Sequence, residues 1–239
     1  MKTVFRYIRI VILQVIFLFR KSVPLSDRTV IIAPHPDDEV FGCAGLIQML
    51  IDCGTPPHVI ILTGGEGSHR GCCDIPAEQI IKERRALALK AAEALGLLSS
   101  HVCFLDYPDE HILMNHSETE KLRELLSCLS PNVVFLPHWG EGMDDHVNSA
   151  KIVKELMNDK KVSIYEYCVW MWYYNVWNLD YKNAYVLNMS HEMHQCKLKA
   201  VEQYITPLAP CGKPWSGVLP KPFLKAAKWN KELYFKAID

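Results

Sequence analysis

The sequence carries almost no net charge: 26 Lys and Arg stand against 27 Asp and Glu in 239 residues, a formal charge of −1 at pH 7. This balance gives no electrostatic footprint for a nucleic acid, so we expect no nucleic-acid partner. The apolar run Ile10–Phe19, broken by Gln14, is far shorter than the roughly 20 residues of a membrane-spanning helix. Internal repeats and Cys-x-x-Cys pairs are missing too, which argues against repeat arrays and against zinc ribbons or redox motifs built on such pairs.

The nine cysteines do not form the pattern of a disulfide framework. Their number is odd, their spacing is irregular, and Cys72 and Cys73 are adjacent. We interpret them as reduced thiols of a cytoplasmic protein that serve as small core hydrophobes.

Residues 1–26 form a basic and apolar segment ahead of one domain, which we place at 27–239. Lys2, Arg6 and Arg9 precede the apolar run, and Arg20 and Lys21 follow it. Residues 1–22 therefore predict either a helix lying on the cytoplasmic membrane face, with peripheral contact to anionic headgroups, or a structural helix packed on the domain. A cleaved secretory signal is disfavoured because no small-residue cleavage site follows.

From residue 27 onward, apolar strands alternate with amphipathic helices. The pattern predicts strands at 29–33, 58–62, 101–105 and 133–136, and helices at 40–52, 77–95, 118–129 and 146–157. It indicates an α/β fold, a Rossmann-like three-layer sandwich around a mostly parallel sheet. The aromatic stretch 163–177 predicts one or two strands that pack in the core or wall a ligand, and the segment 213–235 predicts a helix after several prolines.

Polar side chains follow each of the four predicted strands. They lie in the segments His35–Asp38, Thr63–Gly67, Asp106–Asp109 and Pro137–Glu141. Since the carboxyl ends of parallel strands share one edge of the sheet, we expect the active site there.

The first of these loops carries an imidazole and three consecutive carboxylates. His35 and Asp38 are three residues apart in a turn, and both side-chain types are ligands for zinc. A bound cation would offset the repulsion between neighbouring carboxylates. Capping of the next helix by Asp37, Asp38 or Glu39 is the competing explanation.

A catalytic metal needs a third protein ligand from another rim loop. His146 is the candidate, because it follows Asp144 and Asp145 at the start of a predicted helix after the fourth strand. Asp145, or a nearby backbone carbonyl, could orient its ring.

The stretch APHPDDEVFGCAG, residues 33–45, resembles the signature of the PIG-L/LmbE-like zinc-dependent N-deacetylases, and looser similarity extends over 27–204. The resemblance implies one zinc ion per chain, or iron(II), with His35, Asp38 and His146 as ligands. It also implies Asp37 as general base, and Arg84 and Asp109 as substrate-binding residues. From its position beside the motif, we expect Glu39 either to start the helix or to support the ligand set, as we expect of Asp145 beside His146.

Two positions depart from the family pattern. Met143 stands where the family often has a histidine that donates a proton, so His138 or another group would take that catalytic role. Leu87 replaces a common acidic residue. Glu66, His69 and Arg70 could also line the pocket, whereas His191 and His194 have the wrong spacing for a zinc helix and predict a solvated face.

These observations predict a metal-dependent hydrolase that removes the acetyl group from an N-acetylated amino sugar or sugar conjugate, in glycolipid or surface-polysaccharide biosynthesis. Alternatives are an amidase for another N-acyl or thiol conjugate, a two-metal phosphoesterase, and a non-catalytic membrane-associated protein that binds metal or sugar.

Overall fold

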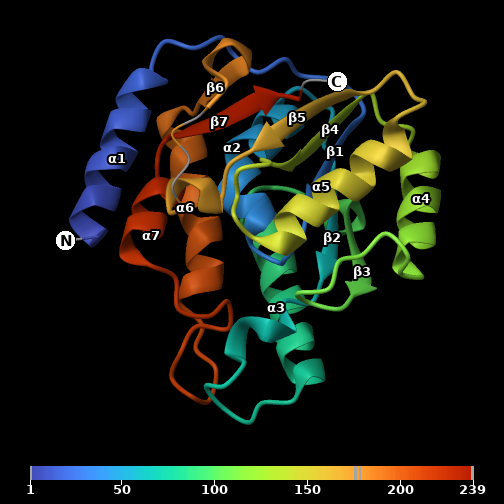
Figure 1. Cartoon of the computed structure of the whole chain (residues 1–239), viewed down its shortest axis with the longest axis vertical. Coiled ribbons are helices and arrows are strands. Elements are labelled where there is room, and N and C mark those ends of the chain that lie inside the picture. Colours follow the sequence, from blue (N-terminus) through green and yellow to red (C-terminus); the bar gives the residue numbers. More distant parts are fainter. Residues whose placement is uncertain (1, 175–176, 178, 238–239) are drawn as a thin grey trace.

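The computed structural model describes residues 2–174, 177 and 179–237. Its helices and strands follow one another along the chain as shown in Figure 1: α1 Lys2–Ile16, β1 Thr29–Ala33, α2 Asp38–Asp52, β2 His58–Thr63, α3 Ala77–Ala94, β3 Val102–Tyr107, α4 Glu118–Leu129, β4 Val133–Pro137, α5 Asp144–Met157, β5 Ser163–Tyr167, β6 Ala184–Asn188, α6 His191–Ile205, α7 Lys221–Ala227 and β7 Lys231–Lys236.

The seven strands form one sheet in the order β3-β2-β1-β4-β5-β7-β6. The first five strands of this order are parallel, and β7 runs antiparallel to both of its neighbours. The predicted α/β fold is thus confirmed. Strand order reverses at β1, which pairs with β2 on one side and β4 on the other, and such a reversal is where α/β proteins bind ligands.

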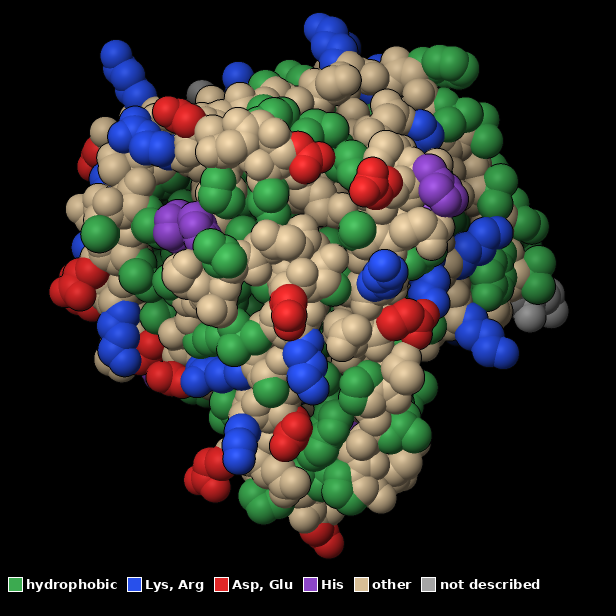
Figure 2. Space-filling view, turned by 180° about the vertical axis from the view of Figure 1, so that it is seen from behind, with side chains coloured by type: hydrophobic (Ala, Val, Ile, Leu, Met, Phe, Trp, Pro, Cys, Tyr) green, Lys and Arg blue, Asp and Glu red, His purple; other side chains and the backbone are tan. Residues whose placement is uncertain are grey.

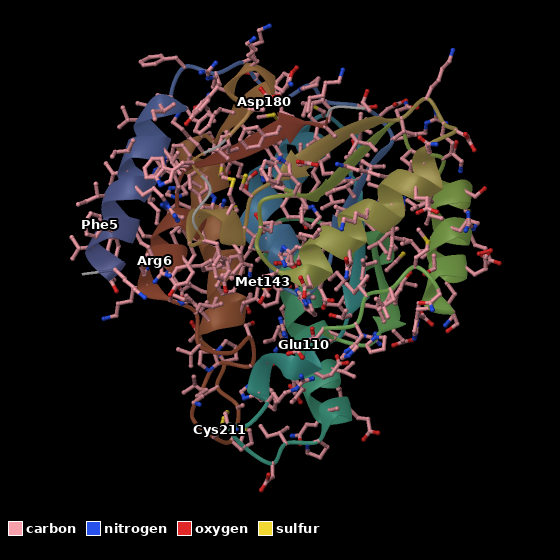
Figure 3. The ribbon with its side chains drawn as sticks, in the orientation of Figure 1. Phe5, Arg6, Glu110, Met143, Asp180 and Cys211 are labelled. Carbon is pink, nitrogen blue, oxygen red and sulfur yellow. The ribbon has the colours of Figure 1, made fainter. Side chains whose placement is uncertain are left out.

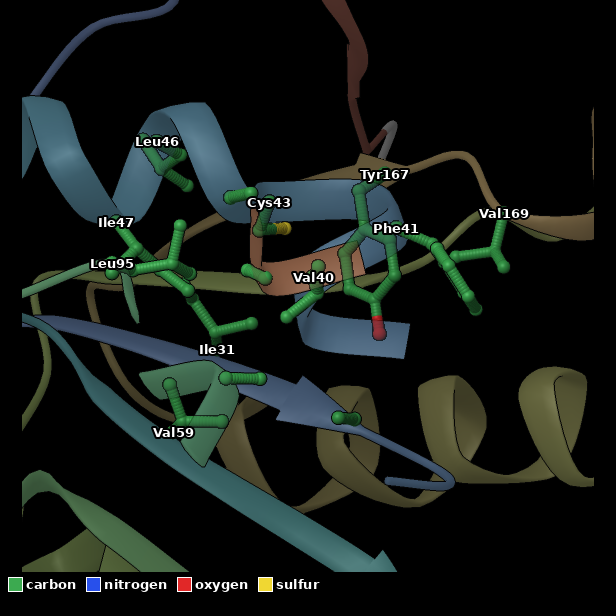
Figure 4. Close-up of a cluster of buried hydrophobic side chains, with 14 of the residues drawn as sticks. Ile31, Val40, Phe41, Cys43, Leu46, Ile47, Val59, Leu95, Tyr167 and Val169 are labelled. Atoms are coloured by element: carbon green, nitrogen blue, oxygen red, sulfur yellow. The ribbon is translucent and has the colours of Figure 1, made fainter. Parts of the chain in front are cut away.

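Alternate residues of the parallel strands face two separate cores, which makes the sandwich three-layered. Ile31 and Ala33 of β1 pack with α2, α3 and α6, whereas Val30 and Ile32 pack with α4 and α5. Figure 4 shows the first of these cores, between α2 and the strands. Both faces are buried, which explains why the parallel strands are apolar at nearly every position.

The N-terminal helix packs on the domain, as one of the two alternatives predicted. Ile10 and Leu13 are buried against the β6–β7 edge and α7, and Arg9 donates a hydrogen bond to the carbonyl oxygen of Trp172. Its opposite face is apolar and exposed: the side chain of Phe5 is 68% exposed and points away from the domain in Figure 3. No helix among the described residues is long and apolar enough to cross a bilayer.

The stretch 163–177 forms one strand, β5, as one of the predicted possibilities, followed by a 3-10 turn at Trp170–Trp172. Residues 175–176 of this stretch lie outside the described part of the chain. The segment 213–235 contains the predicted helix, which is the short α7, and then most of β7, an unexpected strand.

The expected core role holds for Cys43 and Cys168 and is wrong for Cys53 and Cys128, which are exposed. Charges of both signs are interspersed on the face shown in Figure 2.

Candidate metal centre and active site

A cavity of about 550 Å³ opens at the carboxyl ends of the parallel strands. This is a typical volume for a small-molecule site. Its polar part holds most of the predicted site residues, and an apolar wall comes from Phe41, Trp170, Leu219 and Phe223. Trp170 is thus the residue of the aromatic stretch 163–177 that lines the cavity, whereas Tyr165, Tyr167 and Met171 of that stretch are buried in the core.

His35, Asp38 and His146 meet at the polar end of this cavity. Asp38 Oδ2 lies 3.2 Å from His35 Nδ1 and 3.2 Å from His146 Nε2, and it accepts a hydrogen bond of 2.9 Å from the backbone N–H of His35. Their ligand atoms lie close enough together to share one metal ion. The sequence prediction that these three side chains converge is met by the geometry.

The surroundings of His146 favour positive charge at its ring. Both of its ring nitrogens are buried and lack a hydrogen-bond partner among the described residues, although carboxylate oxygens are near. Burial opposes a charged ring, but Asp38 and Glu141 raise the pKa of His146 to about 9. The site thus stabilises positive charge at the point where two imidazoles and a carboxylate face one another. A divalent cation bound there would supply that charge.

The other nitrogen of His35 faces two further carboxylates. His35 Nε2 lies 3.0 Å from Asp109 Oδ1 and 3.3 Å from Asp145 Oδ2. His35, Asp109 and Asp145 form a second group that could hold an ion. Backbone N–H groups already bond both carboxylates, from Gly67 to Asp109 and from Glu110 and Ile112 to Asp145. We therefore interpret them as acceptors that fix the ring of His35.

Glu141 supports His146 and is a residue that our sequence reasoning did not select. Its side chain is completely buried, with Oε2 at 3.2 Å from His146 Nδ1. It also accepts hydrogen bonds from three consecutive backbone N–H groups, those of residues 169–171. The expected orienting residue, Asp145, instead contacts His35. Glu141 follows the fourth strand on the rim of the sheet, and this position was the signal that could have singled it out.

Asp37 lies beside the three candidate ligands in a strained backbone conformation, with φ of 130°. Positive φ at a non-glycine residue costs about 1–3 kcal/mol and is concentrated at functional sites. Burial raises the pKa of Asp37 to about 8, opposed by the Arg84 guanidinium, whose Nη2 lies 3.1 Å from Asp37 Oδ2. Glu39 holds the strained residue in place, because its Oε2 accepts the backbone N–H of Asp37 at 3.0 Å.

Arg84 is bound by protein acceptors on both terminal nitrogens. Nη1 donates to the carbonyl of Gly65 and Nη2 to that of Pro36, each at 2.7 Å. Gly65 has φ of 67°, and a Cβ there would approach Nη1 to 1.9 Å. Arg84 therefore lines the cavity while it donates hydrogen bonds to Asp37 and to two loop carbonyls. Asp109 also lines the cavity, with both of its carboxylate oxygens engaged.

The structure does not bring His138 to the cavity. Its ring is buried against Phe235, and Nδ1 accepts the backbone N–H of Gly140. Burial and the charge of Lys154 lower its pKa to about 3. Met143 does line the cavity, near Glu110 in Figure 3, and His111 is another imidazole along its wall.

Three further residues that could have lined the pocket are used elsewhere. Glu66 accepts the backbone N–H of Asp109, Arg70 pairs with Glu110 at the surface, and His69 is buried beside three cysteines.

The comparisons with known proteins agree with this geometry. The family described as PIG-L, GlcNAc-PI de-N-acetylase, matches residues 30–157, over half of the chain. A curated relative, the probable N-acetyl-α-D-glucosaminyl L-malate deacetylase 2 of Bacillus cereus, is 25% identical over 139 residues. The match spans 54% of this chain and 61% of the relative.

Solved structures share the fold at low identity. The N,N′-diacetylchitobiose deacetylase of Pyrococcus horikoshii superposes with a TM-score of 0.60 at 20% identity, over 73% of this chain and 68% of that one. GalB, the 4-carboxy-2-hydroxymuconate hydratase of Pseudomonas putida, gives 0.58 at 18%, over 74% and 78%. One fold thus carries different reactions, and the family match decides the assignment. The chain belongs to the PIG-L family.

Proposed function

We propose that the protein is a metal-dependent N-deacetylase that acts on an N-acetylated amino sugar or sugar conjugate. The observation that carries this proposal is the convergence of His35, Asp38 and His146 on one point, with Asp37 beside them on the same cavity. Family membership and the deacetylase names of two relatives support the reaction type.

The donor set fits a single zinc ion, or iron(II), because imidazole nitrogen and carboxylate oxygen suit both. Such an ion supplies Lewis acidity, which lowers the pKa of water to about 7 and polarises an amide carbonyl. His35 and His146 would hold it as neutral ligands, with their rings oriented by the carboxylates of Asp109, Asp145 and Glu141.

Asp37 is the proposed proton carrier. Its carboxylate accepts a proton from the attacking water, and the same proton passes to the amide nitrogen as the C–N bond breaks. Acetate and a free amine are then released. A pKa raised by burial, with Arg84 opposing, suits a group that must both take and return a proton. His138, buried outside the cavity, takes no part in this scheme.

The core test measures acetate release from N-acetylglucosamine conjugates bearing malate, a second sugar or an inositol phospholipid. We expect activity that is lost on chelation, restored by zinc, and reduced at least about 100-fold in Asp37→Asn. Asparagine tolerates positive φ, so this variant isolates the loss of the carboxylate. Full activity in chelator, or in Asp37→Asn, would refute the mechanism. Turnover confined to other N-acyl or thiol conjugates, or to phosphoesters, would move the assignment to those alternatives.

We also propose peripheral contact of α1 with the cytoplasmic membrane face, which would suit glycolipid or surface-polysaccharide precursors. Large apolar side chains that are exposed along residues 4–19 support it: Val4, Phe5, Ile8, Val11, Ile12, Val15, Ile16, Leu18 and Phe19. Co-sedimentation with phosphatidylglycerol vesicles should fall in Phe5→Ser/Phe19→Ser and persist in Leu98→Ser, an exposed leucine elsewhere. Equal sedimentation of the variants would contradict the contact.

A further inference from the structure

A second cluster of metal-ligating side chains lies outside the active site. It consists of His69, Cys72, Cys73 and Cys211, whose ligand atoms all lie within 4.8 Å of one another. His69 Nδ1 is 3.5 Å from Cys72 Sγ, 3.5 Å from Cys73 Sγ and 3.6 Å from Cys211 Sγ. Cys72 Sγ is 3.3 Å from Cys73 Sγ and 3.8 Å from Cys211 Sγ. The three cysteines are partly buried.

These separations match a tetrahedral site. Zinc binds thiolate sulfur at about 2.3 Å and imidazole nitrogen at about 2.0 Å, so tetrahedral angles place sulfur about 3.8 Å from sulfur and about 3.5 Å from nitrogen. The three nitrogen–sulfur distances agree with this geometry, and so does the distance between Cys72 and Cys211. The two adjacent cysteines are closer by about half an ångström, a small adjustment of one side chain.

We propose that His69, Cys72, Cys73 and Cys211 bind one structural zinc ion. The site is closed, because four protein ligands complete the coordination that zinc prefers in structural sites. Binding exchanges three thiol protons for the metal without any change of oxidation state. The site shares no residue with the catalytic centre and does not depend on the proposed activity.

The chain presents these ligands from two tight turns. In the first turn, Cys72 donates its backbone N–H to the carbonyl of His69 at 3.1 Å. In the second turn, which carries Cys211, the backbone N–H of Ala209 donates a hydrogen bond of 2.8 Å to the carbonyl of Lys213. Figure 3 shows Cys211 in the loop between α6 and α7, which lies beside the segment following β2. Short turns fix the positions of the four side chains before any metal binds.

A disulfide explains the cluster less well. The Cys72 and Cys211 sulfurs are 3.8 Å apart, against about 2.05 Å for a bond. A bond between any two of the three thiols would leave the third and the imidazole of His69 without a role. A metal ion uses all four side chains, and zinc is the thiolate-binding ion that needs no redox partner.

The zinc would join two walls of the catalytic cavity. Gly67 and Ser68, just before His69, line the cavity, and so do Ser216 and Leu219 beyond Cys211. Ser68 Oγ already donates to the carbonyl of Trp215 at 3.1 Å. Fixing this contact would hold the cavity rim at a constant width, so we expect loss of the ion to raise KM more than it lowers kcat.

The decisive experiment is metal analysis of the intact wild-type protein, purified under reducing conditions. We expect about two equivalents of zinc, one in each site. His35→Ala should lose one and Cys211→Ser the other, while Cys128→Ser, an exposed cysteine on α4, should keep both. Cobalt substitution of wild type and of His35→Ala should give an intense thiolate-to-cobalt charge-transfer band that Cys211→Ser lacks.

Two results would overturn the proposal. One is a single equivalent in wild type that disappears in His35→Ala, since the cysteines would then bind none. The other is a mass two hydrogens lower than expected under non-reducing conditions, which would identify a disulfide. Both are measured on the wild type or on a variant outside the cluster, so misfolding of Cys211→Ser leaves the test intact. Loss of acetate release alone leaves the cysteine-bound equivalent unchanged and bears only on the proposed function.

Discussion

Glu141→Gln tests whether the buried carboxylate behind His146 sets metal affinity. Glu141 Oε1 accepts the N–H groups of Val169 and Met171 at 2.9 and 3.2 Å, and Oε2 accepts that of Trp170 and faces His146 Nδ1. A glutamine keeps the shape but turns one oxygen into an N–H donor. That donor would meet at least one N–H group that has no other acceptor.

The cost follows from these contacts. Loss of one charge-assisted hydrogen bond in a buried site costs about 1.5–3 kcal/mol, and a change of about 2 kcal/mol lowers the Tm of a chain of this size by about 4–8 °C. Removing the support of a ligating histidine typically weakens metal binding about 10–100-fold. We therefore expect both a lower Tm and a higher Kd for the metal at His35, Asp38 and His146.

The assay is competition with a chelating dye, with His35→Ala used to subtract metal held elsewhere, alongside thermal unfolding. Glu120→Gln, which removes a carboxylate from an exposed ion pair on α4, is the control and should change neither value measurably. An unchanged Kd for Glu141→Gln would show that Glu141 fixes only the backbone of residues 169–171 and does not tune His146.

Three further predictions concern other buried contacts. Arg84→Gln should move the acidic limb of the kcat/KM profile to higher pH by about 1–3 units, because Asp37 loses its cationic neighbour; a pH-independent loss would indicate direct substrate contact instead. His138 stays neutral when folded but takes up a proton when unfolded below pH 6.5, so it should remove about 2 kcal/mol of stability between pH 7 and pH 5; urea unfolding of His138→Asn should show a correspondingly weaker pH dependence. Gly65→Ala should lose activity by displacing Arg84, whereas Gly54→Ala, also at positive φ but in open space, should cost only about 1–2 kcal/mol.

The parallel half of the sheet could be predicted because its strands are buried on both faces and therefore read as apolar runs. β6 and β7 could not, since AYVLN is only five residues long, KELYFK mixes polar and apolar residues, and their pairing depends on contacts between distant segments. A β7 residue such as Glu232 shows this: its buried carboxylate bonds Lys197 of α6 and backbone N–H groups of α2.

The metal-binding motif was readable because His35, Asp37 and Asp38 are consecutive or nearly so, and adjacent carboxylates need an explanation. Of the supporting residues, Glu39 and Asp145 were selected from their positions beside the motif residues, but Glu141 was not. Glu141 acts on backbone N–H groups about thirty residues further along, and such acceptors leave no trace in side-chain identity. Cys211 lies 139 positions from Cys72, so no local spacing rule could join them.

The position of β7 has a consequence for synthesis of the protein. Ile10 and Leu13 of α1 pack with Leu233 and Phe235 of β7, and β6 enters the sheet only through β7. During translation, the basic and apolar N-terminal helix is therefore made long before its partners, and its packing against β7 is complete only after residue 236 has been synthesised. Until then, the apolar side chains that α1 packs against β7 stay exposed in the nascent chain, which favours aggregation. Among the described strands, β7 comes last along the chain, and it completes the cover of the buried face of α1.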